Sequence, residues 1–172
     1  ESSRDHSFKE SEKMAADGYR VLALAAGAVG TADLTTIGEL ELTGLVGLID
    51  PLRAEAIPAI KSCQEAGIEV VMITGDHPAT ALSISKRLGI AETYGQLMTG
   101  KELSDIEANA PESLQQEISN KTVFARVTPL QKKVIVDNKK ALGHFVAVTG
   151  DGVNDAPALK SAHIGIAMGS GT

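Results

Sequence analysis

From residue 51 onward, short runs of apolar residues alternate with longer segments in which apolar and polar residues recur at helical spacing. The apolar runs have the length of β-strands and carry almost no charge, which is typical of parallel strands that are buried on both faces. We predict strands at 69–73, 122–125, 144–148 and 163–167. We predict helices at 54–66, 78–89, 101–109, 111–119, 128–142 and 155–161. The alternation predicts an α/β fold, a Rossmann-like parallel sheet with helices on both faces.

The first 49 residues follow a different pattern. A charged segment at 7–17 favours a helix that Gly18 ends, and two apolar strands at 19–25 and 41–49 flank a loop at 26–38 that is rich in Gly and Thr. This stretch is too short to form a domain by itself. We therefore divide the chain into the tail of one domain, residues 1–49, and a second, incomplete domain, residues 50–172.

The amino-acid composition excludes several classes of function. The net charge of −6 argues against binding to a nucleic-acid backbone, and the single cysteine, Cys63, excludes an internal disulfide and fits a reducing, cytosol-facing compartment. The longest apolar run, Val21–Gly30, is about half of the ~20 residues that a membrane span needs. Because the chain also begins with Glu1, we expect a soluble molecule whose start is cut or processed.

The densest polar cluster follows the predicted strand at 144–148. Asp151, Asn154 and Asp155 offer hard oxygen donors, which suit Mg²⁺, and Gly150 and Gly152 permit a tight turn that brings backbone close to a ligand. The alternative is a plain Gly-Asp turn in which Asp155 only favours the start of a helix. The density of the cluster favours the metal site.

Two further segments leave a predicted strand with polar residues. Thr74-Gly75-Asp76 precedes a helix, where a hydroxyl and free N–H groups form a site for phosphate, although Thr74 or Asp76 could instead simply cap that helix. Arg126 ends a strand, and Lys132 lies in the first turn of the next helix; the alternative for Lys132 is a solvated surface lysine. Together these residues indicate phosphoryl transfer, which needs charge neutralisation and alignment. A carboxylate nucleophile on a strand of its own is missing.

Four segments resemble sequence blocks of the P-type cation-transporting ATPases, members of the haloacid dehalogenase-like superfamily. They are GLIDPLR at 47–53, MITGDHPATA at 72–81, VFARVTP at 123–129 and VTGDGVNDAPALKSAHIGIAMGSGT at 148–172. The blocks stand in the order and at the spacing of the family. The resemblance implies ATP and Mg²⁺ as cofactors, and a parent enzyme that hydrolyses ATP through an aspartyl phosphate while it transports a cation. The ion that the resemblance suggests is calcium.

The resemblance also implies a role for individual residues. Asp151 would be the main Mg²⁺ ligand, with Asp155 in support. Thr74, Gly75 and Asp76 would hold the transferring phosphate. The remaining roles are charge neutralisation by Lys132, contact with ATP or phosphate by Arg126 and Asn154, and a domain hinge at Asp50 and Arg53. The parent would lie in the membrane with this segment cytoplasmic, and its nucleotide-binding, actuator and membrane domains would be this segment's partners.

The sequence also lacks a motif that is typical of this family. The Asp-Lys-Thr-Gly-Thr phosphorylation motif is absent. In the family its strand lies mid-sheet, between the strands that lead into Asp76 and Asp151. We therefore expect a sheet without its central strand, closed by pairing of the neighbouring strands or filled by another segment, for example from a second copy. We also expect the isolated chain not to phosphorylate itself.

Two alternatives stay open at this stage. One is a non-catalytic module that binds Mg²⁺ or phosphate. The other is a stand-alone phosphatase of the same superfamily, which would need a nucleophile near the N-terminus; Asp17 and Asp33 do not follow a convincing strand.

Overall fold

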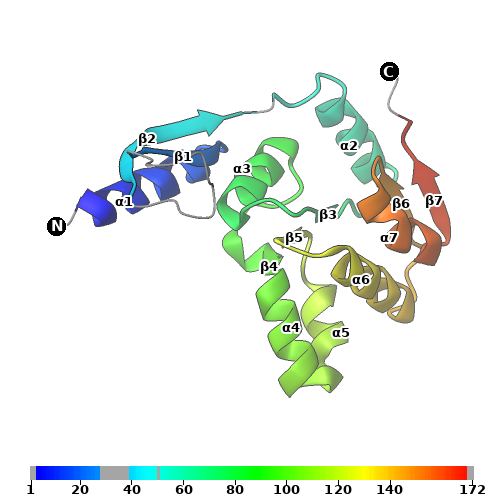
Figure 1. The fold of residues 1–172 in the computed structure, drawn as a ribbon. Coiled ribbons are helices and arrows are strands. Elements are labelled where there is room, and N and C mark those ends of the chain that lie inside the picture. The colour runs from blue at the N-terminus through cyan, green and yellow to red at the C-terminus, as the bar shows by residue number, and fades with distance from the viewer. Residues whose placement is uncertain (1–2, 28–38, 50, 170–172) are drawn as a thin grey trace.

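The computed structural model describes residues 3–27, 39–49 and 51–169, and Figure 1 shows their arrangement. The helices are α1 (Ser3–Ala16), α2 (Ala56–Glu65), α3 (Pro78–Leu88), α4 (Gly100–Asn109), α5 (Leu114–Ser119), α6 (Pro129–Ala141) and α7 (Ala156–Ser161). Short 3₁₀ turns are η2 (Tyr94–Gln96), η3 (Pro111–Ser113) and η4 (Val153–Asp155). The strands are β1 (Arg20–Ala26), β2 (Glu41–Leu48), β3 (Met72–Ile73), β4 (Leu97–Thr99), β5 (Val123–Ala125), β6 (Ala147–Gly150) and β7 (Ile164–Ala167). None of the helices in these ranges has the length and apolar character that crossing a membrane requires.

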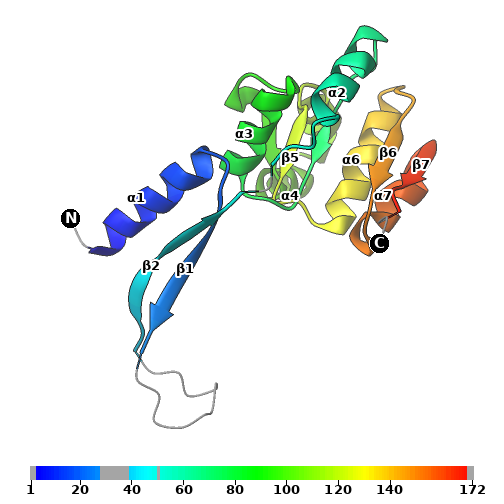
Figure 2. The ribbon, with the colours of Figure 1, turned by 90° about the horizontal axis from the view of Figure 1, so that it is seen from above.

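The N-terminal part consists of α1 and an antiparallel hairpin of β1 and β2, in which Arg20 pairs with Leu48. The hairpin extends away from the rest of the molecule (Figure 2). Gly18 adopts the left-handed conformation, with φ of +94°, and so confirms the predicted helix stop before β1. Most of the loop predicted at 26–38 lies outside the described residues.

The central sheet is parallel, with the strand order β3-β5-β4. All three residues of β5 have no exposed surface, because helices cover both faces of the sheet. One face packs on apolar residues of α2 and α3, including Ile60 and Leu88, and the other packs on α4, α5 and α6 through residues such as Leu103 and Ile135. This arrangement confirms the predicted parallel α/β fold. Strand β4 was not predicted, because its run of three residues is too short to show a period.

A second parallel sheet contains β6 and β7, and Gly165 of β7 leaves room for the backbone of Leu159 in α7. Two predicted boundaries are wrong. The strand expected at 69–73 is paired only at 72–73, and the one expected at 144–148 begins at Ala147 and ends at Gly150. The limits of a strand are set by its hydrogen-bonded partners, and among the described residues β3 pairs with β5 alone.

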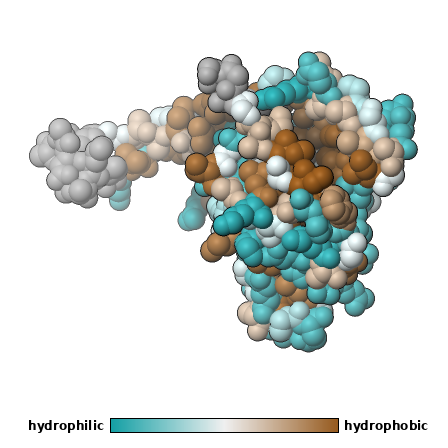
Figure 3. Space-filling model, turned by 90° about the vertical axis from the view of Figure 1, so that its right-hand side faces the viewer, coloured by the Kyte–Doolittle hydropathy of each residue, from teal (hydrophilic) through white to brown (hydrophobic). Residues whose placement is uncertain are grey.

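In the described part of the chain, β3 and β6 end separate sheets and do not pair with each other. The expected closure of the sheet by direct pairing of these neighbours is therefore wrong for these residues. Figure 3 views the molecule from the side of β6 and β7, where hydrophobic side chains gather around a hollow. Ile164 and Ile166 of β7, and Met168 just after this strand, are each about half exposed.

Candidate functional site

The turn formed by Thr74, Gly75 and Asp76 lies at the carboxyl end of β3 and is stabilised by hydrogen bonds between its own residues. The Thr74 hydroxyl donates to Asp76 Oδ2 at 3.0 Å and accepts from the Asp76 N–H at 3.1 Å. The turn is also tied to β5, because the Thr74 N–H donates to the Phe124 carbonyl at 2.8 Å and the Arg126 N–H donates to the Asp76 carbonyl at 3.0 Å. The helix that follows is capped by His77 instead of Thr74 or Asp76, so the capping alternative for these two residues is wrong.

Asp76 forms an ion pair that the sequence did not predict. Its Oδ1 lies 2.7 Å from Nη2 of Arg20, which stands 56 positions earlier at the start of β1. Burial alone would raise the pKa of Asp76, but hydrogen bonds from Arg20 and Thr74 and the charges of Arg20 and Arg126 hold this pKa below 3.8, its ordinary value. Asp76 is therefore ionised at neutral pH, and no local pattern around Arg20 could have shown this contact.

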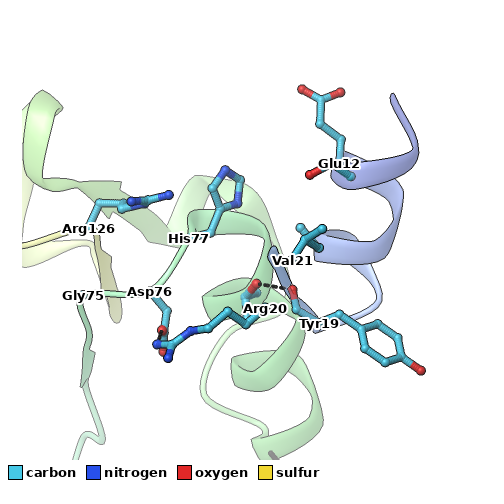
Figure 4. A pocket seen from close by; sticks show the side chains of 11 residues that line it. Glu12, Tyr19, Arg20, Val21, Gly75, Asp76, His77 and Arg126 are labelled. Atoms are coloured by element: carbon cyan, nitrogen blue, oxygen red, sulfur yellow. Dashed lines mark hydrogen bonds and ion pairs between the residues drawn. The ribbon is translucent and has the colours of Figure 1, made fainter. Parts of the chain in front are cut away.

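Asp76 and its neighbours line a cavity of about 350 Å³ between the N-terminal part and the central sheet (Figure 4). Its lining residues come from α1, β1, the turn after β3, the start of α3 and the end of β5. They are Ser11, Glu12, Ala15, Tyr19, Arg20, Val21, Gly75, Asp76, His77, Thr80 and Arg126. Arg126 has a left-handed backbone, with φ of +55°, a conformation that is uncommon outside glycine. The charged residues of the lining are two arginines, Arg20 and Arg126, and two carboxylates, Glu12 and Asp76.

The second cluster lies at the carboxyl end of β6. Lys132 Nζ lies 2.6 Å from Oδ1 of Asp155, and the two side chains are only 17% and 18% exposed. Lys132 is positioned by α6, which begins with a capping box between Thr128 and Gln131. The interpretation of Lys132 as a solvated surface lysine is therefore wrong.

Gly150 makes this pair sterically feasible. A Cβ atom at Gly150 would lie 2.5 Å from Cβ and 2.8 Å from Oδ2 of Asp155, closer than real contacts allow. The glycine at the end of β6 thus leaves the space that the Asp155 carboxylate fills. Besides the predicted tight turn, packing against Asp155 is a second reason for glycine at position 150.

Asp151 and Asn154 are exposed at the same edge. Within residues 3–27, 39–49 and 51–169, Asp151 has no hydrogen bond or ion pair, and no three His, Cys, Asp or Glu side chains are grouped as a metal site. The oxygen donors of Asp151 and Asp155 fit Mg²⁺ chemically, and Mg²⁺ usually completes its shell with water and substrate oxygens. Two carboxylates alone form only part of such a shell, so further oxygen ligands would be needed to hold the ion.

The structure therefore brings the candidate residues together in two groups. Gly75, Asp76 and Arg126 share the cavity beside β1, and Lys132 pairs with Asp155 next to Asp151, but neither Lys132 nor Asp151 lines that cavity. The two groups follow strands of separate sheets, β3 and β6. Of the two expected hinge residues, Arg53 is exposed just before α2 and Asp50 lies outside the described residues.

Comparisons with known proteins agree with the motifs. The family model of haloacid dehalogenase-like hydrolases matches residues 5–163. The chain is 50% identical over 168 residues to cation-transporting ATPase pma1 of Synechocystis, which covers 93% of this chain and 18% of that protein. It is 43% identical over 173 residues to calcium-transporting ATPase 1 of Bacillus cereus, covering 98% of this chain and 19% of that protein.

A calcium-transporting ATPase of Bacillus subtilis is 50% identical over 131 residues, which are 76% of this chain and 14% of that protein. The chain thus spans less than a fifth of the length of these curated relatives. The chain belongs to the haloacid dehalogenase-like hydrolase family, and its resemblance to the P-type cation-transporting ATPases is confirmed along most of its length.

Proposed function

We propose that this chain is the cytoplasmic phosphate-handling segment of a membrane-bound, ATP-driven cation pump. Residues 50–172 supply most of the phosphorylation domain, and residues 1–49 supply the end of the nucleotide-binding domain. The observation that carries the proposal is the largely buried pair of Lys132 and Asp155. Asp151, four residues before Asp155, forms no side-chain hydrogen bond or ion pair with the residues that the structure describes. A cation and two carboxylates at the carboxyl end of a parallel strand suit a transferring phosphoryl group with its metal ion.

The individual roles follow from the chemistry of each side chain. The Gly75 N–H binds a phosphate oxygen, joined by the Thr74 hydroxyl and the Asp76 N–H when these leave the hydrogen bonds that they form within the turn. The Lys132 ammonium neutralises the charge of the phosphoryl group. Asp151, supported by Asp155, holds Mg²⁺, which when bound offsets phosphate charge. Arg126 and Asn154 contact ATP or its phosphates; Arg126 is suited to this because its side chain lines the cavity beside Asp76.

The complete pump would form an aspartyl phosphate on a strand outside this sequence and hydrolyse it as a cation is moved. Two of the relatives are named calcium-transporting ATPases, and this supports Ca²⁺ as the transported ion. The isolated chain would not phosphorylate itself, because the nucleophile motif is absent from its sequence.

The proposal is tested by incubating the isolated chain with γ-labelled ATP and Mg²⁺, alongside the full-length parent pump. We expect an acid-stable, hydroxylamine-sensitive phosphoprotein from the parent and none from the isolated chain. Labelling of Asp76 or Asp155 in the isolated chain would overturn the assigned roles.

The metal assignment is tested by calorimetric titration of the isolated chain with Mg²⁺. Weak binding is expected for the unchanged chain, because two carboxylates form only part of a shell, and Asp151→Asn should abolish it. Asp105→Asn, a change on the exposed surface of α4, is the matched control and should leave the titration unchanged. Equal binding by Asp151→Asn and the unchanged chain would contradict the assignment.

A second candidate function has a specific observation in its favour. Asp155 is engaged by Lys132, so the isolated chain presents an incomplete donor set and would act as a non-catalytic module that binds Mg²⁺ or phosphate. The stand-alone phosphatase is less well supported, since Asp17 lies in an exposed turn after α1 and Asp33 lies outside the described residues. Hydrolysis of p-nitrophenyl phosphate by the isolated chain would favour the phosphatase over both other functions.

Self-association through the open sheet remains a prediction of the same proposal. The end strands β3 and β6 carry no charged residue, so their unpaired backbone groups are free of the charges that usually protect sheet edges. Size-exclusion chromatography with light scattering is expected to show a mass that rises with concentration. A strict monomer at every concentration would count against it.

A further inference from the structure

The protonation state of His77 affects both the start of α3 and the cavity that contains Asp76. It is the N-cap residue of α3, and its Nδ1 accepts the N–H of Ala79 at 3.3 Å. Its side chain also lines the cavity that contains Asp76 and Arg126. A ring nitrogen accepts a hydrogen bond only when it carries no proton, so this cap requires the neutral imidazole with its proton on Nε2.

The charges that face His77 come from several elements. On the cavity side these are Glu12 of α1, Arg20 of β1, Asp76 of the adjacent turn and Arg126 at the end of β5. On its other side His77 borders a shallow groove with Lys86, Arg87 and Tyr94. Aspartate, glutamate, lysine, arginine and tyrosine ordinarily keep one charge state between pH 6 and 8, whereas histidine ordinarily changes in this range.

The cavity contains a cation, Arg126, whose charge acts on Asp76 without a direct contact between the two side chains among the described residues. Asp76 is engaged by Arg20 and Thr74. Arg126, in contrast, makes no side-chain hydrogen bond or ion pair with any residue that the structure describes. In Figure 4 the Arg126 side chain extends toward the His77 ring, while Asp76 turns toward Arg20. A protonated His77 would therefore place a second cation beside Arg126.

We propose that His77 makes anion binding in this cavity sensitive to pH. The neutral ring caps α3; the protonated ring leaves the Ala79 N–H without its acceptor and adds a positive charge to the cavity. An anion of the phosphate class stabilises the protonated form and so binds more tightly as pH falls, and by linkage its binding favours uptake of a proton. The inference rests on the proposed function in one respect, that this cavity receives phosphate groups.

The test uses sulfate as the probe, because it carries two negative charges throughout pH 6–8 and cannot itself explain a change. Sulfate is titrated into the 172-residue chain at pH 6 and pH 8, and the amide signal of Ala79 and the ring signals of His77 are followed by NMR. The affinity for sulfate is expected to be about fivefold higher at pH 6 than at pH 8. The Ala79 amide should move with the His77 ring as the pH changes in the absence of sulfate.

The matched variant is His77→Asn, since asparagine is a good N-cap that does not titrate. It should keep α3 folded and bind sulfate equally at both pH values. His144→Asn, an exposed histidine near the C-terminal end of α6, should behave like the unchanged chain.

Equal sulfate affinity at pH 6 and pH 8 in the unchanged chain would overturn the inference and leave the proposed function standing. The same pH dependence in His77→Asn would also overturn it. An absence of sulfate binding at both pH values would overturn the inference together with the assignment of phosphate to this cavity, while the Mg²⁺ titration would still test Asp151 separately.

Discussion

Strands β5 and β7 have similar residue composition, but β5 is buried and β7 is exposed to solvent. Both are short, uncharged and parallel. All of β5 is fully buried, whereas each residue of β7 is exposed, with Ile166 at 47%. The difference lies in their neighbours: β5 has a strand on each side and helices on both faces, and β7 has only β6 beside it within the described part of the sheet. Burial of an apolar strand is thus decided by what the rest of the chain places around it.

The largest expected loss of stability comes from a substitution in β5, and the equivalent change in β7 should cost much less. Phe124→Ala in β5 removes a fully buried ring and should lower the free energy of unfolding by about 3–5 kcal/mol. Ile166→Ala in β7 should cost about 1 kcal/mol or less, because the side chain is already half in water. Urea denaturation followed by circular dichroism measures both changes. Similar losses in the two variants would show that β7 is buried in solution by something else.

A buried and an exposed ion pair should also differ in how much stability is lost when each is broken. Lys132→Ala leaves Asp155 without its partner at a position where both side chains are mostly buried, and should cost about 2–3 kcal/mol, since breaking a fully buried pair costs about 3–5. Lys133→Ala, one residue along α6, breaks an exposed pair with Asp137 and should cost about 0.3–0.5 kcal/mol. Thermal unfolding of the two variants measures the difference. A Lys132 variant as stable as the Lys133 variant would mean that the Asp155 carboxylate is solvated.

The smallest effect concerns the pair between β1 and the turn after β3. The pKa of Asp76 is lowered in the folded chain, so its contribution to stability is complete above the ordinary value of 3.8 and disappears as pH falls through the lower folded value. Because Arg20 is largely exposed, we expect this contribution to be below about 1 kcal/mol. Asp76→Asn should therefore lose less stability than the unchanged chain when the pH is lowered from 5 to 2.5 in urea denaturation.

The control for acid titration is Asp105→Asn on α4, which should lose stability with acid as the unchanged chain does. Identical acid curves for the unchanged chain and Asp76→Asn would show that the contact with Arg20 does not persist in solution.

Local features of the fold could be predicted because their causes lie within a few residues. Gly89 ends α3 with a left-handed φ of +70°, and the Thr128-Pro129 start of α6 has the cap that its residues indicated. The short strand β4 and the true ends of β3 and β6 could not be predicted, because a strand's limits depend on hydrogen bonds to chain that is distant in sequence. For the site, the residue types that suit phosphate and Mg²⁺ were visible in the sequence, but Arg20 and the role of His77 as a cap were not.

The residues alone predict the order of the motifs, the parallel α/β class and the position of Asp76 and Asp151 at strand ends. These follow from residue types and spacings over a few positions, where chain geometry leaves little choice. Tertiary packing brings Lys132 to Asp155 across 23 positions and Arg20 to Asp76 across 56. The same packing separates the parallel strands of the described residues into two sheets, β3-β5-β4 and β6-β7. Such contacts depend on how distant segments pack together, and the residues around one position do not show which distant segment that position will contact.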